Sequence, residues 1–231
     1  MCIVKSLKKH TIMDKAVYMR FKMISIIGVD GSGKTTQANL LIHQLRLKGI
    51  PVKYVWFRYN HLLSLIPLIY ARIFGYTIYE KHGENLNGRH EFYRSCFLSK
   101  VYPITLFIDM TLSYLIKIAI PKKMGNIFVS DRCIYDTIVD LMIDLDNLNF
   151  LDSFIGTFYR KIVPSWDTKV FFLDIDESLI VERRPELLFD TSLKKRRLAY
   201  QIIAEQFPVT TIMNDGEIHE TNEKILKSLN N

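Results

Sequence analysis

The sequence has few cysteines, and they are too far apart to form a recognisable pattern. Cys2, Cys96 and Cys133 are odd in number and show no Cys-x-x-Cys spacing. This excludes a disulfide-rich secreted scaffold, and we expect a reduced, cytosolic compartment. The six histidines also lack the spacing of metal ligands, so the sequence predicts no zinc site.

The sequence also has no uninterrupted apolar run that resembles a secretory signal or a membrane span. Residues 1–22 are rich in lysine and are interpreted as a basic N-terminal arm. The stretch 101–121 approaches the length of a span, but Asp109 and Lys117 interrupt it. Each charge would cost about 2.5–3.5 kcal/mol at a bilayer centre, so we expect a buried helix there.

The length of 231 residues is enough for one α/β domain with one insertion, which we expect over residues 23–231. The formal net charge is +7. A basic balance favours an anionic partner, but by itself it does not separate nucleotide from nucleic acid or an acidic membrane.

The strongest motif is a glycine-rich turn that follows a short apolar run. Gly28 is followed, after four residues, by Gly33-Lys34-Thr35, which is the spacing of a P-loop. In such a loop, backbone N–H groups surround phosphate, the lysine reaches the β- and γ-phosphates, and the hydroxyl binds Mg²⁺. Apolar residues at helical spacing follow over 38–47, so strand, loop and helix are expected in this order. The expected nucleotide-binding residues are Gly28, Asp30, Gly31, Ser32, Gly33, Lys34, Thr35 and Thr36.

A second strand is predicted over residues 52–57, and Arg58 follows its end. Ligands bind outside the carboxyl ends of parallel strands, so Arg58 is placed to meet substrate; a solvated loop arginine is the alternative. Residues 59–100 are interpreted as a helical insertion, with helices over 62–74 and 91–102 and a loop over 83–88. A further helix is predicted over 104–120.

Residues 127–132 predict a buried strand that delivers Asp131 and Arg132 to the same edge of the sheet as the P-loop. There a carboxylate can hold Mg²⁺ and an arginine can hold phosphate. A helix-capping acid beside a surface arginine is the alternative. Three acidic residues at helical spacing follow: Asp136, Asp140 and Asp144. We expect them to form a solvated stripe on one helix face. A functional role is a hypothesis for Asp140 alone.

A strand is predicted over 170–174, followed by a helix over 177–184 that Asp176 caps. Arg183 and Arg184 end this helix and begin a candidate lid over 183–192, where mobile arginines would serve phosphoryl transfer. Ordinary charge at a helix C-terminus is the alternative.

A helix over 193–206, a strand over 209–213 and a helix over 221–229 complete the predicted domain. The basic cluster 194–197 lacks interleaved aromatic residues, so we expect a solvated face and no nucleic-acid partner.

In this order the motifs resemble those of the thymidylate kinases, within the nucleoside monophosphate kinases. The resemblance covers most of residues 23–229 outside the insertion. It rests on the P-loop, Ser130-Asp131-Arg132, the strand end at Asp174 and the pair Arg183-Arg184. It implies a P-loop NTPase fold, with a doubly wound five-stranded parallel sheet flanked by helices, that uses ATP and Mg²⁺ on a nucleoside monophosphate. No N-K-x-D motif of GTPases is present.

The resemblance also implies roles for individual residues. When the family's roles are carried over by position, Asp30 faces the acceptor sugar, and Arg58 and Arg132 hold its phosphate. Thr35 and Asp131 hold the metal, and Arg183 and Arg184 belong to the lid. With Gly31 in the loop and two arginines in the lid, the chain resembles family members whose lid supplies the catalytic cations. Lys34, Arg132 and the lid pair would then act by positioning and charge neutralisation.

The chain departs from the family at the acceptor site. Phe107 is nearly in register with the residue that stacks on the base, but the arginine expected beside it is absent. The alanine-tyrosine-glutamine contact is replaced by Val139-Asp140-Leu141, and the P-G-G-T stretch after Arg58 is missing. A carboxylate such as Asp140 would accept from an amino group, which favours cytosine or guanine as a hypothesis.

The first functional hypothesis is therefore transfer of phosphoryl from ATP to a nucleoside monophosphate, with dTMP to dTDP foremost. The alternatives are a kinase for another nucleotide or small phosphate acceptor, and a non-catalytic nucleotide-binding regulator. No membrane partner is expected in the first hypothesis, and a homodimer is left open.

Overall fold

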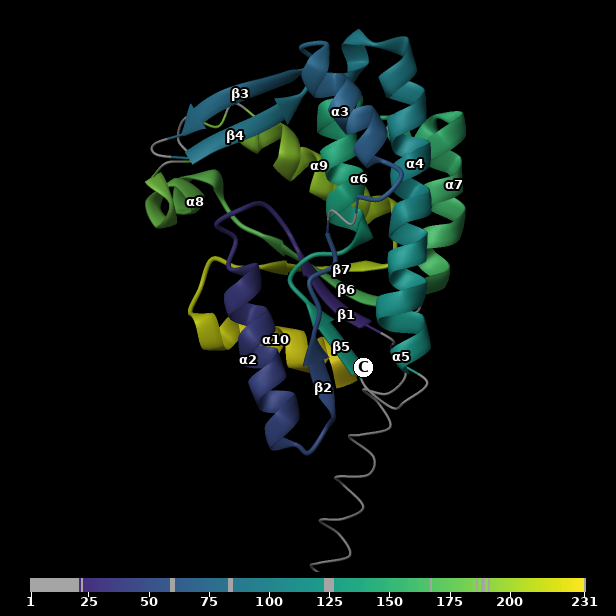
Figure 1. The fold of residues 1–231 in the computed structure, drawn as a ribbon. Helices are drawn as coiled ribbons and strands as arrows, with labels where there is room; N and C mark the ends of the chain where they lie inside the picture. The colour runs from purple at the N-terminus through teal and green to yellow at the C-terminus, as the bar shows by residue number, and fades with distance from the viewer. Residues whose placement is uncertain are drawn as a thin grey trace, which may run out of the picture.

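The structure, a computed structural model, describes residues 21, 23–58, 61–82, 85–122, 127–166, 168–185, 187, 190 and 192–230. Within them a five-stranded sheet forms the centre of the molecule, and all its neighbouring strands are parallel (Figure 1). In spatial order the strands are β2 (Val52–Tyr54), β5 (Ile127–Ser130), β1 (Met23–Ile27), β6 (Thr168–Asp174) and β7 (Val209–Met213). This order confirms the predicted doubly wound parallel sheet.

Helices cover both faces of this sheet, because its central strands are apolar on both sides. β1 and β5 are buried along their whole length. One face packs against α2 (Lys34–Leu47) and α10 (Ile218–Asn230). The helices on the opposite face are α4 (Cys96–Tyr114), α6 (Ile134–Asp144), α7 (Phe154–Ile162) and α9 (Leu193–Gln206).

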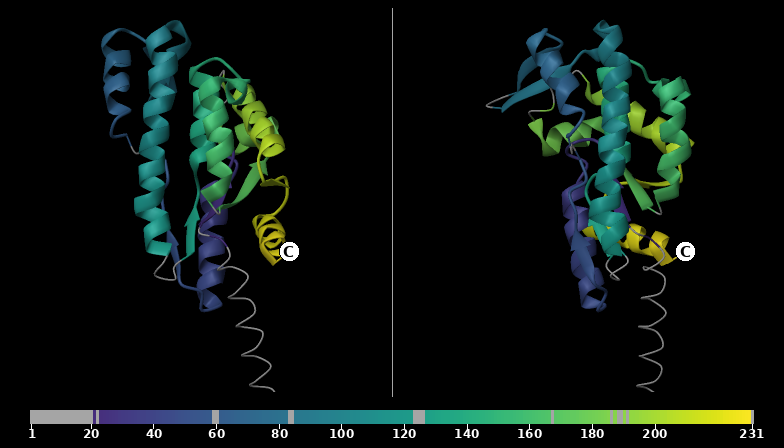
Figure 2. Two further views of the ribbon diagram at one scale, coloured as in Figure 1. Left: turned by 90° about the vertical axis from the view of Figure 1, so that its right-hand side faces the viewer. Right: turned by 45° about the vertical axis from the view of Figure 1, so that its right-hand side comes forward.

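The long helix α4 stands along one side of the molecule (Figure 2). It continues through the π-helical turn η2 (Leu115–Ala119) into α5 (Ile120–Lys122). The prediction of two helices, over 91–102 and 104–120, is therefore wrong, because Pro103 lies inside α4. A proline removes one helical hydrogen bond, but buried contacts on both sides of it, at Leu98 and Leu106, hold the helix together.

Only one side of α4 is buried. Leu106 and Met110 lie in the core, whereas Ile108 and Leu112 are exposed. By length and composition the stretch Cys96–Ala119, with a mean hydropathy of 1.4, is the one helix in the described part of the chain that could cross a membrane. This is weak evidence for a span, since 39% of the stretch is buried inside the protein and core helices pass the same test. The predicted buried helix is thus confirmed for one face.

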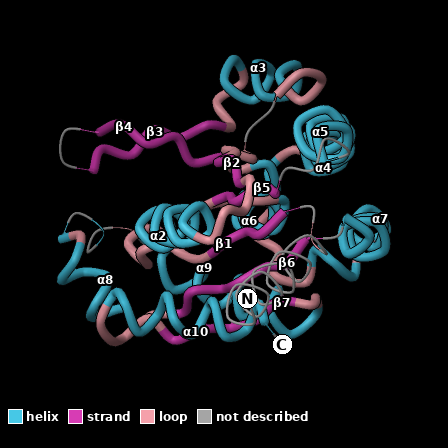
Figure 3. The backbone as a smooth tube through the Cα atoms, turned by 90° about the horizontal axis from the view of Figure 1, so that it is seen from below, coloured by secondary structure: helices cyan, strands magenta, loops and turns pink. Residues whose placement is uncertain are grey.

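Among its described residues, the insertion contains one α-helix and one hairpin, followed by the short helix η1 (Phe92–Arg94) and the start of α4. α3 (Leu65–Ile73) lies within the predicted helix 62–74. The antiparallel strands β3 (Thr77–His82) and β4 (Asn85–His90) form a two-stranded sheet apart from the main one (Figure 3). The prediction of a loop over 83–88 is wrong for residues 85–88, because cross-strand pairing outweighs the low strand propensity of asparagine and glycine. Residues 83 and 84 lie outside the described residues.

The other elements are close to their predicted positions. β2 is shorter than the predicted strand 52–57, and α10 begins at Ile218 rather than at residue 221. α8 begins after Asp176, whose carboxylate accepts from the Ser178 N–H at 3.1 Å, as expected for an N-cap. The short helices are η1 (Phe92–Arg94), η3 (Phe150–Asp152), η4 (Val163–Trp166) and α8 (Glu177–Arg183). Apart from Phe21, the predicted basic arm lies outside the described residues.

Candidate active site

The P-loop runs from the end of β1 to the first turn of α2. Gly28, Gly31 and Gly33 all have positive φ, at 146°, 85° and 87°. A Cβ atom at Gly28 would lie 2.7 Å from the Leu173 carbonyl oxygen of β6, so a larger residue does not fit there. These glycines let the backbone curl around the space in front of α2, where the helix N-terminus favours an anion.

Asn214 supports the loop from the end of β7. Its side-chain amide donates to the Ser32 carbonyl at 2.6 Å, and its oxygen accepts from the Thr221 hydroxyl at 2.7 Å. The Arg183 guanidinium donates to the Asn214 backbone carbonyl at 3.2 Å. The sequence interpretation treated residues 214–216 as a simple turn and missed this role. The signal that points to it is the position of Asn214 directly after a strand of the parallel sheet.

Lys34 lies at the mouth of the loop and is 6% exposed. Its ammonium donates to the Val29 carbonyl at 2.7 Å and to Asp30 at 3.3 Å. Burial lowers the pKa of Lys34, and the Asp30 charge partly opposes this shift. Desolvation favours the neutral acid at Asp30, but Lys34 and Arg132 hold the pKa of Asp30 well below its ordinary value.

Asp131 follows β5 and faces the P-loop. One carboxylate oxygen accepts from the Thr35 hydroxyl at 2.7 Å, and the other accepts from the Tyr54 hydroxyl at 2.8 Å. Desolvation and the bond to Asp131 raise the pKa of Tyr54 to about 12. Thr35 and Asp131 present oxygen atoms, which are the ligands that Mg²⁺ prefers, so the residues fit the predicted metal site. The contribution of Tyr54 was missed by sequence reasoning.

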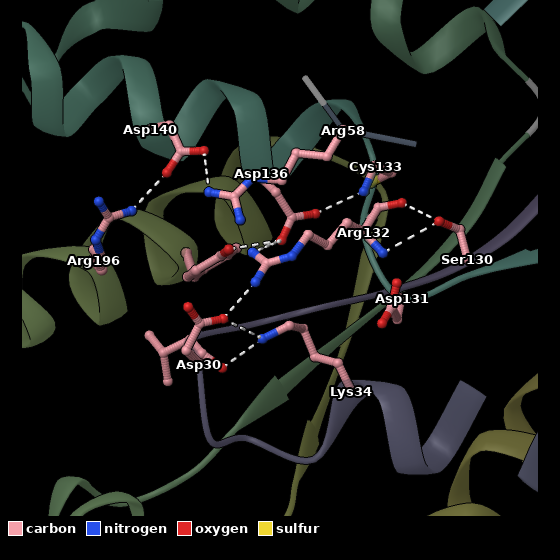
Figure 4. Close-up of polar contacts among 12 residues, drawn as sticks. Asp30, Lys34, Arg58, Ser130, Asp131, Arg132, Cys133, Asp136, Asp140 and Arg196 are labelled. Carbon is pink, nitrogen blue, oxygen red and sulfur yellow. Dashed lines mark hydrogen bonds and ion pairs between the residues drawn. The ribbon is translucent and has the colours of Figure 1, made fainter. Parts of the chain in front are cut away.

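Arg132 lies beside Asp131 and points toward the P-loop (Figure 4). Its guanidinium donates to Asp30 at 2.5 Å and lies 4.0 Å from Asp136. Burial favours the neutral form, but Asp136 and Asp30 raise the pKa of Arg132 above its ordinary value. Asp136 is itself buried and accepts from the Tyr200 hydroxyl at 2.7 Å. Arg132 is thereby held between two carboxylates at the cleft.

Asp140 joins two arginines from distant segments. It accepts from Arg58 at 2.7 Å and from Arg196 of α9 at 2.6 Å, one on each carboxylate oxygen (Figure 4). Burial opposes ionisation, but these two charges lower the pKa of Asp140 to about 2. Each oxygen already accepts from an arginine but has a second lone pair, so the hypothesis that Asp140 accepts from a base amino group stays a prediction.

The expectation of a solvated face is wrong for the acidic stripe and for Arg196 and Arg197 of the basic cluster, whereas Lys194 is exposed. The acidic stripe, Asp136, Asp140 and Asp144, is buried, because α6 packs its acids against α9 and the insertion instead of water. In the basic cluster, Arg196 pairs with Asp140, and Arg197 pairs with Asp174 at 2.7 Å. A buried carboxylate needs a partner, which explains why acid and base patterns on α6 and α9 coincide.

Two cavities meet at this cluster. The first has a volume of about 590 Å³ and is lined by the P-loop, Asp131, Arg183, Arg184 and Asn214. The second, of about 700 Å³, lies between Arg58, Arg196 and the insertion. Asp30 and Arg132 line both. We call the first the P-loop cavity and the second, after the role proposed for it below, the acceptor cavity.

The lid arginines lie in the P-loop cavity, but Phe107 lies elsewhere. A Cβ atom at Gly31 would lie 3.5 Å from the Arg184 side chain, so this arginine packs over the loop. The ring of Phe107 contacts Tyr159 of α7 at 4.6 Å between centroids. Tyr102 and Leu106 of α4 line the acceptor cavity instead. The structure therefore does not bring Phe107 to the site. Residues 186, 188, 189 and 191 of the predicted lid lie outside the described residues.

The fold has a solved counterpart. The chain is similar to the crystal structure of thymidylate kinase from Ehrlichia chaffeensis, with a TM-score of 0.51 and 19% sequence identity over 90% of this chain and 97% of that one. The protein has the P-loop NTPase α/β fold. No protein-family profile matches the sequence, and no curated protein does. At this identity the likeness concerns the fold, and the activity has to be argued from the site.

Proposed function

We propose that the protein transfers the terminal phosphoryl group of ATP to a nucleoside monophosphate, with dTMP, giving dTDP, as the foremost acceptor. The observation that carries this proposal is the junction of the two cavities at Asp30 and Arg132. A triphosphate in the P-loop and a monophosphate in the acceptor cavity would meet there end to end. A transfer between two bound anions requires this arrangement.

In this proposal the chain positions both phosphates and neutralises their charge. Lys34 and the P-loop N–H groups hold the donor phosphates, while Arg132 and Arg58 bind the acceptor phosphate. An acceptor oxygen forms a bond to the γ-phosphorus as the bond to the ADP oxygen breaks. Arg183 and Arg184, which line the P-loop cavity, stabilise the charge that spreads over the transferred oxygens.

Thr35 and Asp131 would hold Mg²⁺ beside the donor phosphates. Bound there, the ion supplies additional neutralisation of the β- and γ-phosphate charge.

The acceptor arginines are already paired with carboxylates. Arg132 contacts Asp30, and Arg58 contacts Asp140. An incoming phosphate would compete with these carboxylates for the guanidinium groups. Because the ion pairs hold the guanidinium groups in place, the phosphate would bind in a fixed orientation. The Thr137 hydroxyl, buried and without a partner among the described residues, also lines this cavity and is a further group for the acceptor.

A panel of nucleoside monophosphates tests the proposal. Purified protein with Mg²⁺ and ATP should release ADP only when a suitable monophosphate is added, and dTMP should be among the active acceptors. Tight ATP binding without turnover on any monophosphate would instead favour a nucleotide-binding regulator. Turnover on another phosphorylated acceptor would assign the alternative kinase activity.

A further inference from the structure

The insertion forms the wall of the acceptor cavity that lies opposite the P-loop. α3 contributes Arg72 to this wall, β4 contributes Arg89 and His90, and His61 lies in the segment before α3. In Figure 1 the hairpin β3–β4 and α3 stand above the carboxyl edge of the main sheet, across from the P-loop. We call this wall the far end of the cavity.

Among the side chains that the structure describes at the far end, arginine outnumbers carboxylate. Arg89 and Arg94 both donate to Glu91, each at 3.0 Å, so one carboxylate serves two guanidinium groups. The guanidinium of Arg72, an exposed residue, forms no ion pair or hydrogen bond with any of the described residues. The nearby Asp109 is already occupied, since it accepts from the Ser64 hydroxyl and from three backbone N–H groups.

The two histidines of the far end have lowered pKa values, mainly because they are buried. His90 shares a hydrogen bond of 3.0 Å with the Thr77 hydroxyl and stacks on Phe92, which fixes its ring. Burial lowers the pKa of His90 to about 4, and the Arg72 charge contributes to this shift. Burial and Arg72 also lower the pKa of His61. Neither ring therefore carries a charge at neutral pH that could pair with a carboxylate.

A ligand that fills the cavity displaces the water that now screens Arg72. A neutral group against Arg72 would leave a desolvated, unpaired charge, which is costly. An anion would compensate this charge and accept hydrogen bonds from the guanidinium.

We propose that the far end of the acceptor cavity is a second anion subsite, and that an acceptor with an anionic group, carboxylate or phosphate, opposite the phosphate that is extended binds more tightly than dTMP, whose base is neutral. Arg72 is the main binding residue and Arg89 assists it. This inference rests on the proposed function only in naming the ligand an acceptor, because the subsite itself can be measured without turnover.

Titration with inorganic phosphate tests the subsite. The full chain, with Mg²⁺ and ADP saturating the P-loop, is titrated in a calorimeter. Two phosphates should bind per chain. Arg72→Gln should weaken one of them about tenfold, since it removes a charge-assisted hydrogen bond. Arg132→Gln should weaken the other one, and Arg72→Lys should retain both.

The matched control is Arg160→Gln, which removes an exposed arginine of α7 outside the cavity and should leave both phosphates in place. Binding of a single phosphate to the wild-type protein would overturn the proposal, as would an Arg72→Gln titration identical to that of the wild type. A parallel titration with acetate distinguishes carboxylate from phosphate. Whichever of acetate and phosphate binds more tightly at the Arg72-dependent subsite identifies the anionic group that the subsite prefers.

The two proposals fail separately. If the Arg72-dependent phosphate binds but no monophosphate is phosphorylated, the kinase proposal fails and the subsite stands. If a monophosphate is phosphorylated but phosphate binding does not depend on Arg72, the subsite fails and the kinase proposal stands.

Discussion

The two walls of the acceptor cavity differ in how their charges are compensated. On the P-loop wall, Arg132 and Arg58 each contact a carboxylate, at 2.5 Å and 2.7 Å. On the insertion wall, Arg72 has no such partner among the described residues. The first wall is therefore fixed in shape before ligand binds, because its cations are held in place by ion pairs. The second carries a charge that a ligand has to compensate.

The largest expected effect concerns the P-loop wall. Lys34→Ala removes the cation that faces the donor phosphates, so turnover should fall by about a thousandfold, within the range seen when a transition-state contact is lost. Initial rates of ADP release measure this. Lys53→Ala, at an exposed position of β2, is the control and should keep the wild-type rate. Wild-type turnover in the Lys34→Ala protein would show that the P-loop lysine takes no part in the reaction.

The next effect concerns the metal site on the same wall. Tyr54→Phe removes the hydrogen bond that orients Asp131. The Mg²⁺ concentration for half-maximal ATP binding, measured by calorimetry, should rise about tenfold, as is typical when a partner of a metal ligand is lost. Trp56→Phe, a few residues further along and half exposed, is the matched aromatic control. An unchanged Mg²⁺ requirement in Tyr54→Phe would show that Asp131 does not depend on this bond.

A smaller effect is expected on the insertion wall. Arg72→Gln should raise the KM for the acceptor that the panel identifies by about fivefold to tenfold and leave kcat nearly unchanged, because Arg72 lies far from the transferred group. Steady-state kinetics separate the two constants. A change in kcat without a change in KM would mean that the insertion acts on the chemical step, and the contrast between the two walls would disappear.

The smallest effect concerns stability. Burial and the neighbouring Asp140 charge raise the pKa of Asp144 well above its ordinary value. The folded state then keeps a proton that the unfolded state loses above about pH 4. Stability therefore falls as pH rises from there through the folded pKa. Asp144→Asn has no proton to lose, so it should be more stable at neutral pH by about 1 kcal/mol, or about 2–4 °C in Tm.

Thermal melts at several pH values check this, and the gain should vanish below about pH 4. The exposed Asp152→Asn is the control. An Asp144→Asn protein that is less stable at every pH would mean that the ionised carboxylate is stabilising.

The two walls also differ in how far the sequence predicts them. The P-loop spacing and the strand ending at Asp131 specify positions at one sheet edge, because parallel strands bring their carboxyl ends together. Arg132 therefore lies close to where its pattern indicated. Arg196 and Asp140 were missed as a pair, since local patterns show that each helix has a charged stripe but not that α6 and α9 face each other.

Apart from α3, the insertion could not be predicted in this way. Asn85 and Gly88 have turn propensity, but their backbone pairs with β3, for which the sequence predicted no element. The predicted helices 91–102 and 104–120 left out Pro103, but tertiary packing places it inside α4. Phe107 was assigned to the base site from its register with a family motif. In the structure its ring packs against Tyr159 instead. In each case cross-strand or tertiary contacts, which a local sequence pattern does not show, decide where the residue lies.

The central claim is that donor and acceptor phosphates meet at Arg132. The most direct measurement compares Arg132→Gln with the wild type for both kcat and ATP binding, using the acceptor identified by the panel. The account predicts a fall in kcat of about a hundredfold or more, with the Kd for ATP within a few-fold of the wild type. Equal kcat in the two proteins would contradict it.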